Sequence, residues 1–338
     1  METHRGKAVI ALGFALALAA CVRQEAPPAT SLESFSEGRF GFRSYTRLYW
    51  DELVPARFDG LEEVVIDAEI QLPDSKAGPL PAVIIMHGSG GAGARQQRYA
   101  DALNEIGIAT AVLDSFGARG IRTTGGRQEQ VSSSTMIGDV YALLNLLASH
   151  PQIDDKRIGL MGTSKGGAVT VLSADEQVRR ALARDGARFA AHAALYPACV
   201  IQFQRPQASG APVLMMLGAL DSYTPAVQCE AQAEKMRAAA FPVREIVYPD
   251  AHHAWDATYE VRKSDFDFSY GGCQLEIDPQ GRGIDPKTGE VLDPRDLAAA
   301  RRWIRACATP GVWIGRNQAA KDQSLADLKT FFRETLLE

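Results

Sequence analysis

The sequence has no long run of lysine or arginine, no Cys-x-x-Cys motif and only six histidines. Its formal net charge is −5, so it lacks the basic surface that binds nucleic acid, and we expect no nucleic-acid partner. The missing cysteine and histidine clusters argue against a zinc site, and we expect no metal and no organic cofactor. What is present is an acidic chain of 338 residues, 46% hydrophobic, which is long enough for one sizeable core.

An apolar segment near the N-terminus is too short to cross a bilayer. Arg5 and Lys7 precede an apolar run over residues 8–20, whereas a transmembrane helix needs about 20 apolar residues. Cys21 follows small residues at the end of this run, as in the lipobox of bacterial lipoproteins. We predict a signal peptide over residues 1–21, lipidation of Cys21 and a membrane-anchored position in the bacterial cell envelope. An ordinary signal peptide, with a soluble periplasmic or secreted product, is the alternative.

The other four cysteines are suited to disulfide bonds, because an exported protein folds in an oxidising environment. Four cysteines allow three pairings. Pairing of nearest neighbours predicts the disulfides Cys199–Cys229 and Cys273–Cys307, with free buried thiols as the alternative.

Strand-like apolar runs alternate with helical patterns along most of the chain. Such alternation predicts an α/β fold, a doubly wound and mostly parallel sheet with helices on both faces. Residues 22–40, rich in proline, serine and glutamate, predict a flexible tether, and residues 41–338 a single domain. Residues 256–295, rich in glycine, aspartate and proline, predict a surface insertion in that domain. Strands are expected at residues 66–72, 82–86, 108–113, 158–161, 190–196, 212–217 and 243–248, and helices at 166–172, 226–240, 297–307 and 325–337.

The strongest chemical signal is a Gly-x-Ser-x-Gly motif centred on Ser164. It follows an apolar strand and precedes a helix, which is the setting of a nucleophile elbow. Gly162 and Gly166 suit a turn that is too tight for side chains at the flanking positions. The serine hydroxyl then lies at the N-terminus of a helix, where developing negative charge is stabilised. We predict that Ser164 is a nucleophile.

A serine hydroxyl needs a base to act as a nucleophile, and two adjacent histidines are placed to supply one. His252 and His253 follow the last predicted strand, at the edge of the sheet where this fold gathers its site. Asp221 follows another strand at the same edge, and an acid there orients the imidazole. On position alone, either histidine can be the base. We prefer Asp221 as the acid over two competitors near the histidines, Asp250 and Asp256.

Stabilisation of a tetrahedral oxyanion requires two N–H donors near the nucleophile. The residue after the nucleophile, Lys165, supplies one of them in an elbow of this kind. The second is expected from a glycine-rich loop after the strand at 82–86, in which Ser89 and Gly88 are both candidates. His87, in the same loop, is expected to brace the loop and not to act as a base.

From about residue 60 to residue 260 the chain resembles the dienelactone hydrolase family of α/β-hydrolases. The resemblance rests on the predicted elbow and on segments 87–91, 114–120, 218–221 and 248–255. It implies the α/β-hydrolase fold, and it implies His253 as the base, because the base of that family lies two residues before an aromatic residue. Here that aromatic residue is Trp255.

The resemblance also implies candidates for a substrate pocket, namely Ser115, Arg119, His87 and Trp255. A structural ion pair is the alternative for Arg119. Dienelactone hydrolases carry a cysteine at the elbow where this chain has Ser164, so the resemblance does not extend to the dienelactone reaction.

We therefore expect a serine hydrolase that cleaves a small-molecule carboxylic ester or lactone through an acyl-enzyme. A peptidase of the prolyl-oligopeptidase type is the enzymatic alternative. A non-catalytic envelope lipoprotein that uses this fold for binding is the alternative from another class.

Overall fold

The computed structural model describes residues 27–53, 57–74, 78–184, 186–293 and 295–338. The predicted signal peptide and the lipidation site Cys21 lie outside these residues. Within these ranges, no helix is both long enough and apolar enough to cross a membrane.

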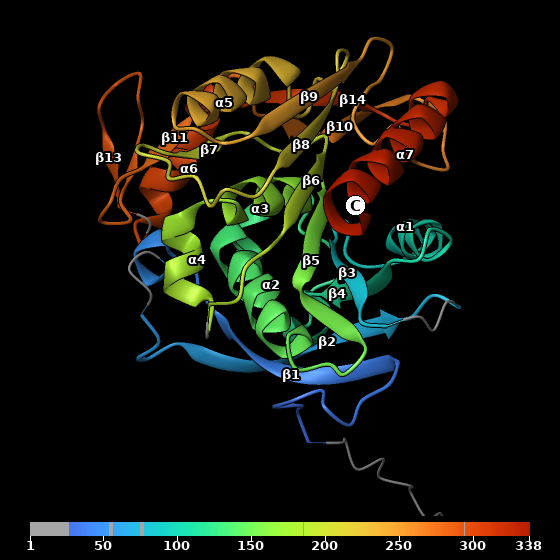
Figure 1. Cartoon of the computed structure of the whole chain (residues 1–338). Coiled ribbons are helices and arrows are strands. Elements are labelled where there is room, and N and C mark those ends of the chain that lie inside the picture. Colours follow the sequence, from blue (N-terminus) through green and yellow to red (C-terminus); the bar gives the residue numbers. More distant parts are fainter. Residues whose placement is uncertain (1–26, 54–56, 75–77, 185, 294) are drawn as a thin grey trace, which may run out of the picture.

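An eight-stranded sheet runs through the centre of the structure (Figure 1). The pairs β1–β2 and β2–β4 are antiparallel, and all other neighbouring strands of the sheet are parallel. This mixed, mostly parallel sheet confirms the predicted fold class. In spatial order the strands are β1 (Gly38–Thr46), β2 (Glu62–Gln71), β4 (Ala109–Asp114), β3 (Leu80–Met86), β5 (Ile153–Thr163), β6 (Ala191–Leu195), β8 (Val213–Gly218) and β9 (Val243–Tyr248).

Helices cover both faces of the sheet. Side chains of a strand point alternately to its two sides, so an apolar strand such as β3 has apolar surface on both faces that must be shielded from water. In β3, for example, Val83 belongs to the core on one face and its neighbour Ile84 to the core on the other. One face is covered by α1 (Ala94–Asn104) and α7 (Gln318–Phe332), and the other by α2 (Ser133–Leu147), α3 (Lys165–Ser173), α4 (Glu176–Leu182) and α5 (Ala226–Ala238).

The first described segment differs from the tether predicted over residues 22–40. Leu32 is buried in the core, and its backbone N–H donates a 2.8 Å hydrogen bond to Ser149 Oγ. The backbone N–H of Ala29 donates to a carbonyl of β1, which is itself the edge strand of the sheet. The tether prediction is therefore wrong for residues 27–40. The cause is that a few apolar side chains among polar ones were enough to dock this segment.

The segment predicted as an insertion, residues 256–295, forms short strands that pair with distant parts of the chain. One of them pairs with a strand near the C-terminus and another with a strand that follows β6; neither partner was predicted. The strands of the insertion are β10 (Arg262–Ser269), β11 (Leu275–Ile277), β12 (Gly283–Ile284) and β13 (Val291–Leu292). Their partners outside it are β14 (Thr309–Ile314), which pairs with β10, and β7 (Ile201–Phe203), which pairs with β11. Helix α6 (Leu297–Cys307) lies between the insertion and β14.

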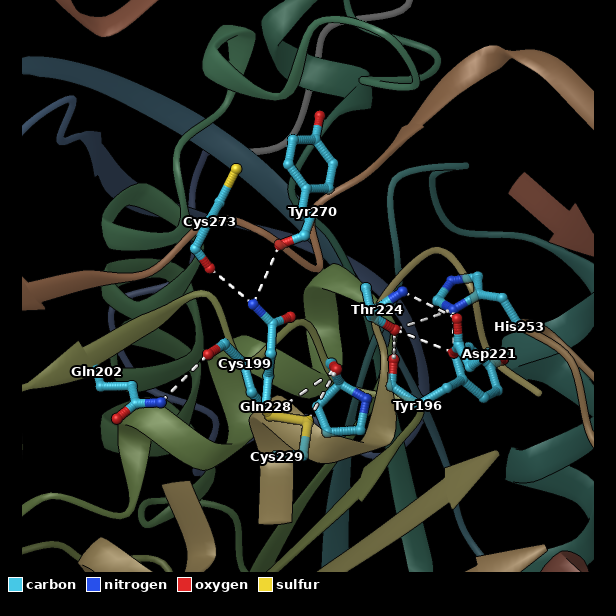
Figure 2. Close-up of a disulfide and its surroundings, with 11 residues drawn as sticks. Tyr196, Cys199, Gln202, Asp221, Thr224, Gln228, Cys229, His253, Tyr270 and Cys273 are labelled. Carbon is cyan, nitrogen blue, oxygen red and sulfur yellow. Dashed lines mark hydrogen bonds and ion pairs between the residues drawn. A yellow bond between two sulfur atoms is a disulfide. The ribbon is translucent and has the colours of Figure 1, made fainter. Parts of the chain in front are cut away.

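The structure contains the disulfides Cys199–Cys229 and Cys273–Cys307, which confirms the predicted pairing. The first links the segment after β6 to α5, and the second links the insertion to the end of α6. Figure 2 shows Gln228 between the two linked regions; its amide donates hydrogen bonds to the carbonyl oxygens of Tyr270 and Cys273. Because disulfides persist in oxidising compartments, they indicate an extracellular or periplasmic protein.

Candidate active site

Ser164 lies in the turn between β5 and α3, with φ of 55° and ψ of −115°. A non-glycine residue in this region is strained by about 1–3 kcal/mol, and strain of this kind concentrates at functional sites. The flanking glycines make the turn possible. A Cβ atom at Gly162 would lie 2.2 Å from the carbonyl oxygen of Gly166, and a Cβ atom at Gly166 would lie 2.5 Å from that of His87. The local geometry is therefore that of the predicted nucleophile elbow.

The structure brings Ser164, His253 and Asp221 together from three separate loops. His253 Nε2 lies 2.9 Å from Ser164 Oγ, and His253 Nδ1 lies 2.7 Å from Asp221 Oδ2. The imidazole and the carboxylate are both buried. A carboxylate accepts and cannot donate, so Nδ1 carries the proton and Nε2 is free to accept the serine hydroxyl.

Asp221 is held in place by the loop that follows β8. Its Oδ1 accepts the backbone N–H groups of Tyr223 and Thr224, each over 2.8 Å. The hydroxyl of Thr224 lies 3.0 Å from Asp221 Oδ2 and 3.1 Å from His253 Nδ1, as Figure 2 shows. Thr224 was not among the site residues predicted from the sequence. Its position three residues after an aspartate in the turn that follows a strand is typical of a turn capped by the aspartate side chain, and this was the available signal.

Two aromatic rings flank the imidazole of His253. The ring centroid of Tyr196 lies 4.9 Å away and that of Tyr223 lies 4.8 Å away. Tyr223 also reaches the predicted insertion, since its hydroxyl donates a 3.0 Å hydrogen bond to Asp267 and its ring stacks on Tyr270. The insertion thus lies beside the three assembled residues.

The competing histidine and aspartates lie elsewhere in contacts of their own. His252 Nδ1 lies 3.0 Å from the carbonyl oxygen of Leu220. Asp256 is buried, and accepts hydrogen bonds from the hydroxyls of Tyr99 and Tyr196. Asp250 is exposed. Position therefore favours His253 over its neighbour, and it favours Asp221 over both alternative acids.

The glycine-rich loop that was expected to supply an oxyanion donor passes directly over the elbow. A Cβ atom at Gly88 would lie 3.2 Å from the Cβ atom of Ser164. Ser89, next in the loop, donates its hydroxyl to Gln128 Oε1 over 3.0 Å. Lys165 is the first residue of α3, so its backbone N–H has no acceptor within the helix. These positions suit the predicted donors.

Two buried side chains brace this loop and its neighbour. His87 is fully buried, with Nδ1 2.8 Å from the carbonyl oxygen of Gly88, and its Nε2 accepts the backbone N–H of Ser115 over 3.1 Å. Burial lowers the pKa of His87, so a neutral bracing role suits it. The ammonium of Lys165 donates to the carbonyl oxygens of Gln128, over 2.7 Å, and Val131. Burial lowers the pKa of Lys165 to about 7.

Three of the residues implied as pocket candidates, Ser115, Trp255 and His87, have no exposed surface. Ser115 and Trp255 are fully buried, and the indole of Trp255 donates to Ser324 Oγ over 2.9 Å. Arg119 forms a two-armed ion pair with Asp139, at 2.7 and 3.0 Å, which is the structural alternative for this residue. The predicted pocket role is therefore wrong for Ser115, Trp255 and His87, because none of these side chains has any exposed surface that a substrate could contact.

Comparison with known proteins identifies the family of this chain. The sequence profile of the dienelactone hydrolase family matches residues 66–271, more than half of the chain. The chain belongs to the dienelactone hydrolase family. This membership confirms the predicted enzyme class, a hydrolase that acts on ester bonds.

Two similar proteins share less than a quarter of their aligned residues with this dienelactone hydrolase family member. It is 24% identical over 209 residues to a putative carboxymethylenebutenolidase of Methylorubrum extorquens, an alignment that covers 59% of this chain and 71% of the relative. It is also similar to the crystal structure of a dienelactone hydrolase-like promiscuous phosphotriesterase from metagenomic libraries, at 15% identity and a TM-score of 0.52, over 88% of this chain and 99% of that one. This second likeness shows the fold.

Proposed function

We propose that the protein hydrolyses carboxylic esters or lactones with Ser164 as the nucleophile, His253 as the base and Asp221 as the orienting acid. The observation that carries the proposal is the unbroken hydrogen-bonded path from Asp221 Oδ2 through both imidazole nitrogens to Ser164 Oγ. In this path each group holds the proton, or the free lone pair, that the next step of the chemistry needs.

The proposed reaction has two halves. In the first, Ser164 Oγ attacks the ester carbonyl while His253 Nε2 takes the hydroxyl proton, and His253 then returns that proton to the departing alcohol as the ester C–O bond breaks. In the second half, water attacks the acyl-enzyme with the same proton transfers, which releases the acid and restores Ser164. The backbone N–H groups of Lys165 and of Ser89 or Gly88 stabilise the oxyanion of both tetrahedral intermediates.

The test is the Ser164→Ala variant of the purified protein, with Ser34→Ala as the matched control, because Ser34 is exposed and far along the chain from the site. Hydrolysis of p-nitrophenyl acetate and labelling by a fluorophosphonate probe should both disappear in Ser164→Ala and persist in the control. Full activity and labelling in Ser164→Ala would refute the proposal. The corresponding p-nitroanilide distinguishes an esterase from a peptidase, since faster cleavage of the amide than of the ester would indicate a peptidase. No activity of the wild type on either substrate would indicate the non-catalytic alternative.

We also propose that the signal peptide is cleaved before Cys21 and that the lipidated cysteine anchors the domain in the cell envelope. The support is the sequence pattern at residues 1–21 together with the two disulfides. Expression in a bacterium fed with radiolabelled palmitate should give a labelled protein in the membrane fraction. Cys21→Ser should lose both the label and the membrane association, and a labelled Cys21→Ser protein would contradict the proposal.

A further inference from the structure

A groove of about 880 Å³ lies between β1, α2 and the segment that follows α4, and we call it the β1–α2 groove. β1 and α2 lie next to each other at this edge of the sheet (Figure 1). None of Ser164, Asp221 and His253 lines the groove. Its volume is within the range of sites that bind small organic molecules. The groove is therefore a separate candidate site, and its lining indicates what it binds.

Arg47 lines the β1–α2 groove although it is only 2% exposed. Its Nε is buried and has no hydrogen-bond partner among the residues that the structure describes. The rings of Tyr45 and Phe58, which contact each other, lie next to the guanidinium, with centroids 5.6 and 5.0 Å from its Cζ. Aromatic faces hold a guanidinium in one orientation but do not neutralise its charge.

The carboxylate that attracts the Arg47 charge most strongly, that of Asp139, is already paired with another arginine. Asp139 accepts two hydrogen bonds from Arg119, and Ser44 donates its hydroxyl to the same carboxylate. The guanidinium groups of Arg47 and Arg119 thus both interact with the single carboxylate of Asp139, and the partly exposed Glu52 adds a weaker attraction for Arg47. Burial lowers the pKa of Arg47, and the Asp139 charge offsets this only in part. A buried charge without a counter-ion is unfavourable, and a bound anion would remove that penalty.

The backbone of α2 leaves room for the Arg47 guanidinium at a glycine, Gly138. A Cβ atom at Gly138, in the interior of α2, would lie only 2.3 Å from Arg47 Nη1. Glycine is unfavourable inside a helix, so its presence at this contact is explained by the guanidinium that occupies the space.

The rest of the lining is basic at the rim and apolar along α2. Among the described residues of this lining, those that carry charge are four exposed cations and one acid, namely Arg43, Lys156, Arg184, Arg188 and Asp155. One of the cations, Arg43, is paired with Glu63 at 3.3 Å. Ala142 and Leu146 present apolar surface next to them. We propose that the β1–α2 groove binds an organic anion, with a phosphate or carboxylate head group on Arg47 and an apolar body along α2.

The test is isothermal titration of the purified protein with octyl phosphate at low salt. We expect saturable binding that weakens about tenfold or more in Arg47→Gln, because a charge-assisted contact is lost. Gly138→Ala should also weaken binding, although it removes no charge, because the new Cβ atom displaces the guanidinium. Arg301→Gln removes an exposed cation of α6 that does not line the groove, and should leave the affinity unchanged.

Three results would overturn the proposal. They are the absence of saturable binding, equal affinity of the wild type and Arg47→Gln for octyl phosphate, and binding of octanol as tight as that of octyl phosphate. If Arg47→Gln does not fold, as judged by circular dichroism, the rim variant Lys156→Gln with Arg188→Gln decides, and unchanged affinity there also overturns it. Sedimentation with phosphatidylglycerol vesicles identifies the source of the head group. Co-sedimentation that is lost in the same variants indicates a lipid, and octyl phosphate binding without co-sedimentation indicates a soluble anion.

Discussion

The variant Asp221→Asn tests the proposed catalytic geometry most sharply, because the structure dictates how the new amide must point. Asp221 Oδ1 accepts two backbone N–H groups, those of Tyr223 and Thr224. Only the amide oxygen can take this position, so the NH₂ group must replace Oδ2, which lies 2.7 Å from His253 Nδ1. An NH₂ group donates, and Nδ1 must therefore give up its proton and accept.

The imidazole proton then moves to Nε2, where it faces Ser164 Oγ. In that tautomer His253 donates to the serine and cannot take its proton, so the base is lost while the shape of the site is kept. We expect kcat/KM for p-nitrophenyl acetate at neutral pH to fall about 10³- to 10⁴-fold, which corresponds to about 4–5.5 kcal/mol of transition-state stabilisation. The downfield proton resonance of the His253 Nδ1–H group should disappear from the NMR spectrum.

Asp250→Asn is the matched control, because this exposed aspartate is near the histidines in sequence but its carboxylate makes no hydrogen bond within the described part of the chain. It should keep the activity of the wild type. Retention of more than about a tenth of the wild-type kcat/KM in Asp221→Asn, a loss of less than about 1.4 kcal/mol, would refute the reasoning. A large loss in Asp250→Asn with Asp221→Asn intact would assign the acid differently.

Two further predictions concern stability. Replacing both Cys273 and Cys307 with serine should lower the unfolding free energy by about 3–4 kcal/mol, since the disulfide closes a loop with a sequence separation of 34. Urea denaturation measures this loss, and an unchanged denaturation midpoint would contradict the prediction. Burial lowers the pKa of Lys165 from 10.5 to about 7. At a pH between these two values the folded protein therefore binds one proton fewer than the unfolded chain. The unfolding free energy of the wild type, relative to Lys165→Met, should therefore rise with pH from 7 towards 9, by at most about 1.4 kcal/mol per pH unit, and a flat or falling difference would argue against a depressed pKa.

Local constraints made much of the molecule predictable from the sequence alone. The elbow at Ser164 needs glycine at 162 and 166 because backbone atoms lie where side chains would be, and that requirement is visible as a motif. The buried parallel strands are visible for a similar reason, since a strand covered on both faces must be apolar along its whole length. The disulfide pairing followed from proximity along the chain.

Contacts between distant segments were decided only by the tertiary structure. The choice of His253 over its neighbour depends on which imidazole faces Ser164 after three loops converge, and position along the chain cannot settle it. Trp255 has the spacing of a site residue, yet packing places it in the core. Among the described residues Arg47 forms no direct ion pair, and Asp139, which lies in another element, is already paired with Arg119. The sequence determined the fold class and the tight turn at Ser164, whose causes are local. The tertiary structure determined the partners of each charged group, because those depend on all the segments that surround it.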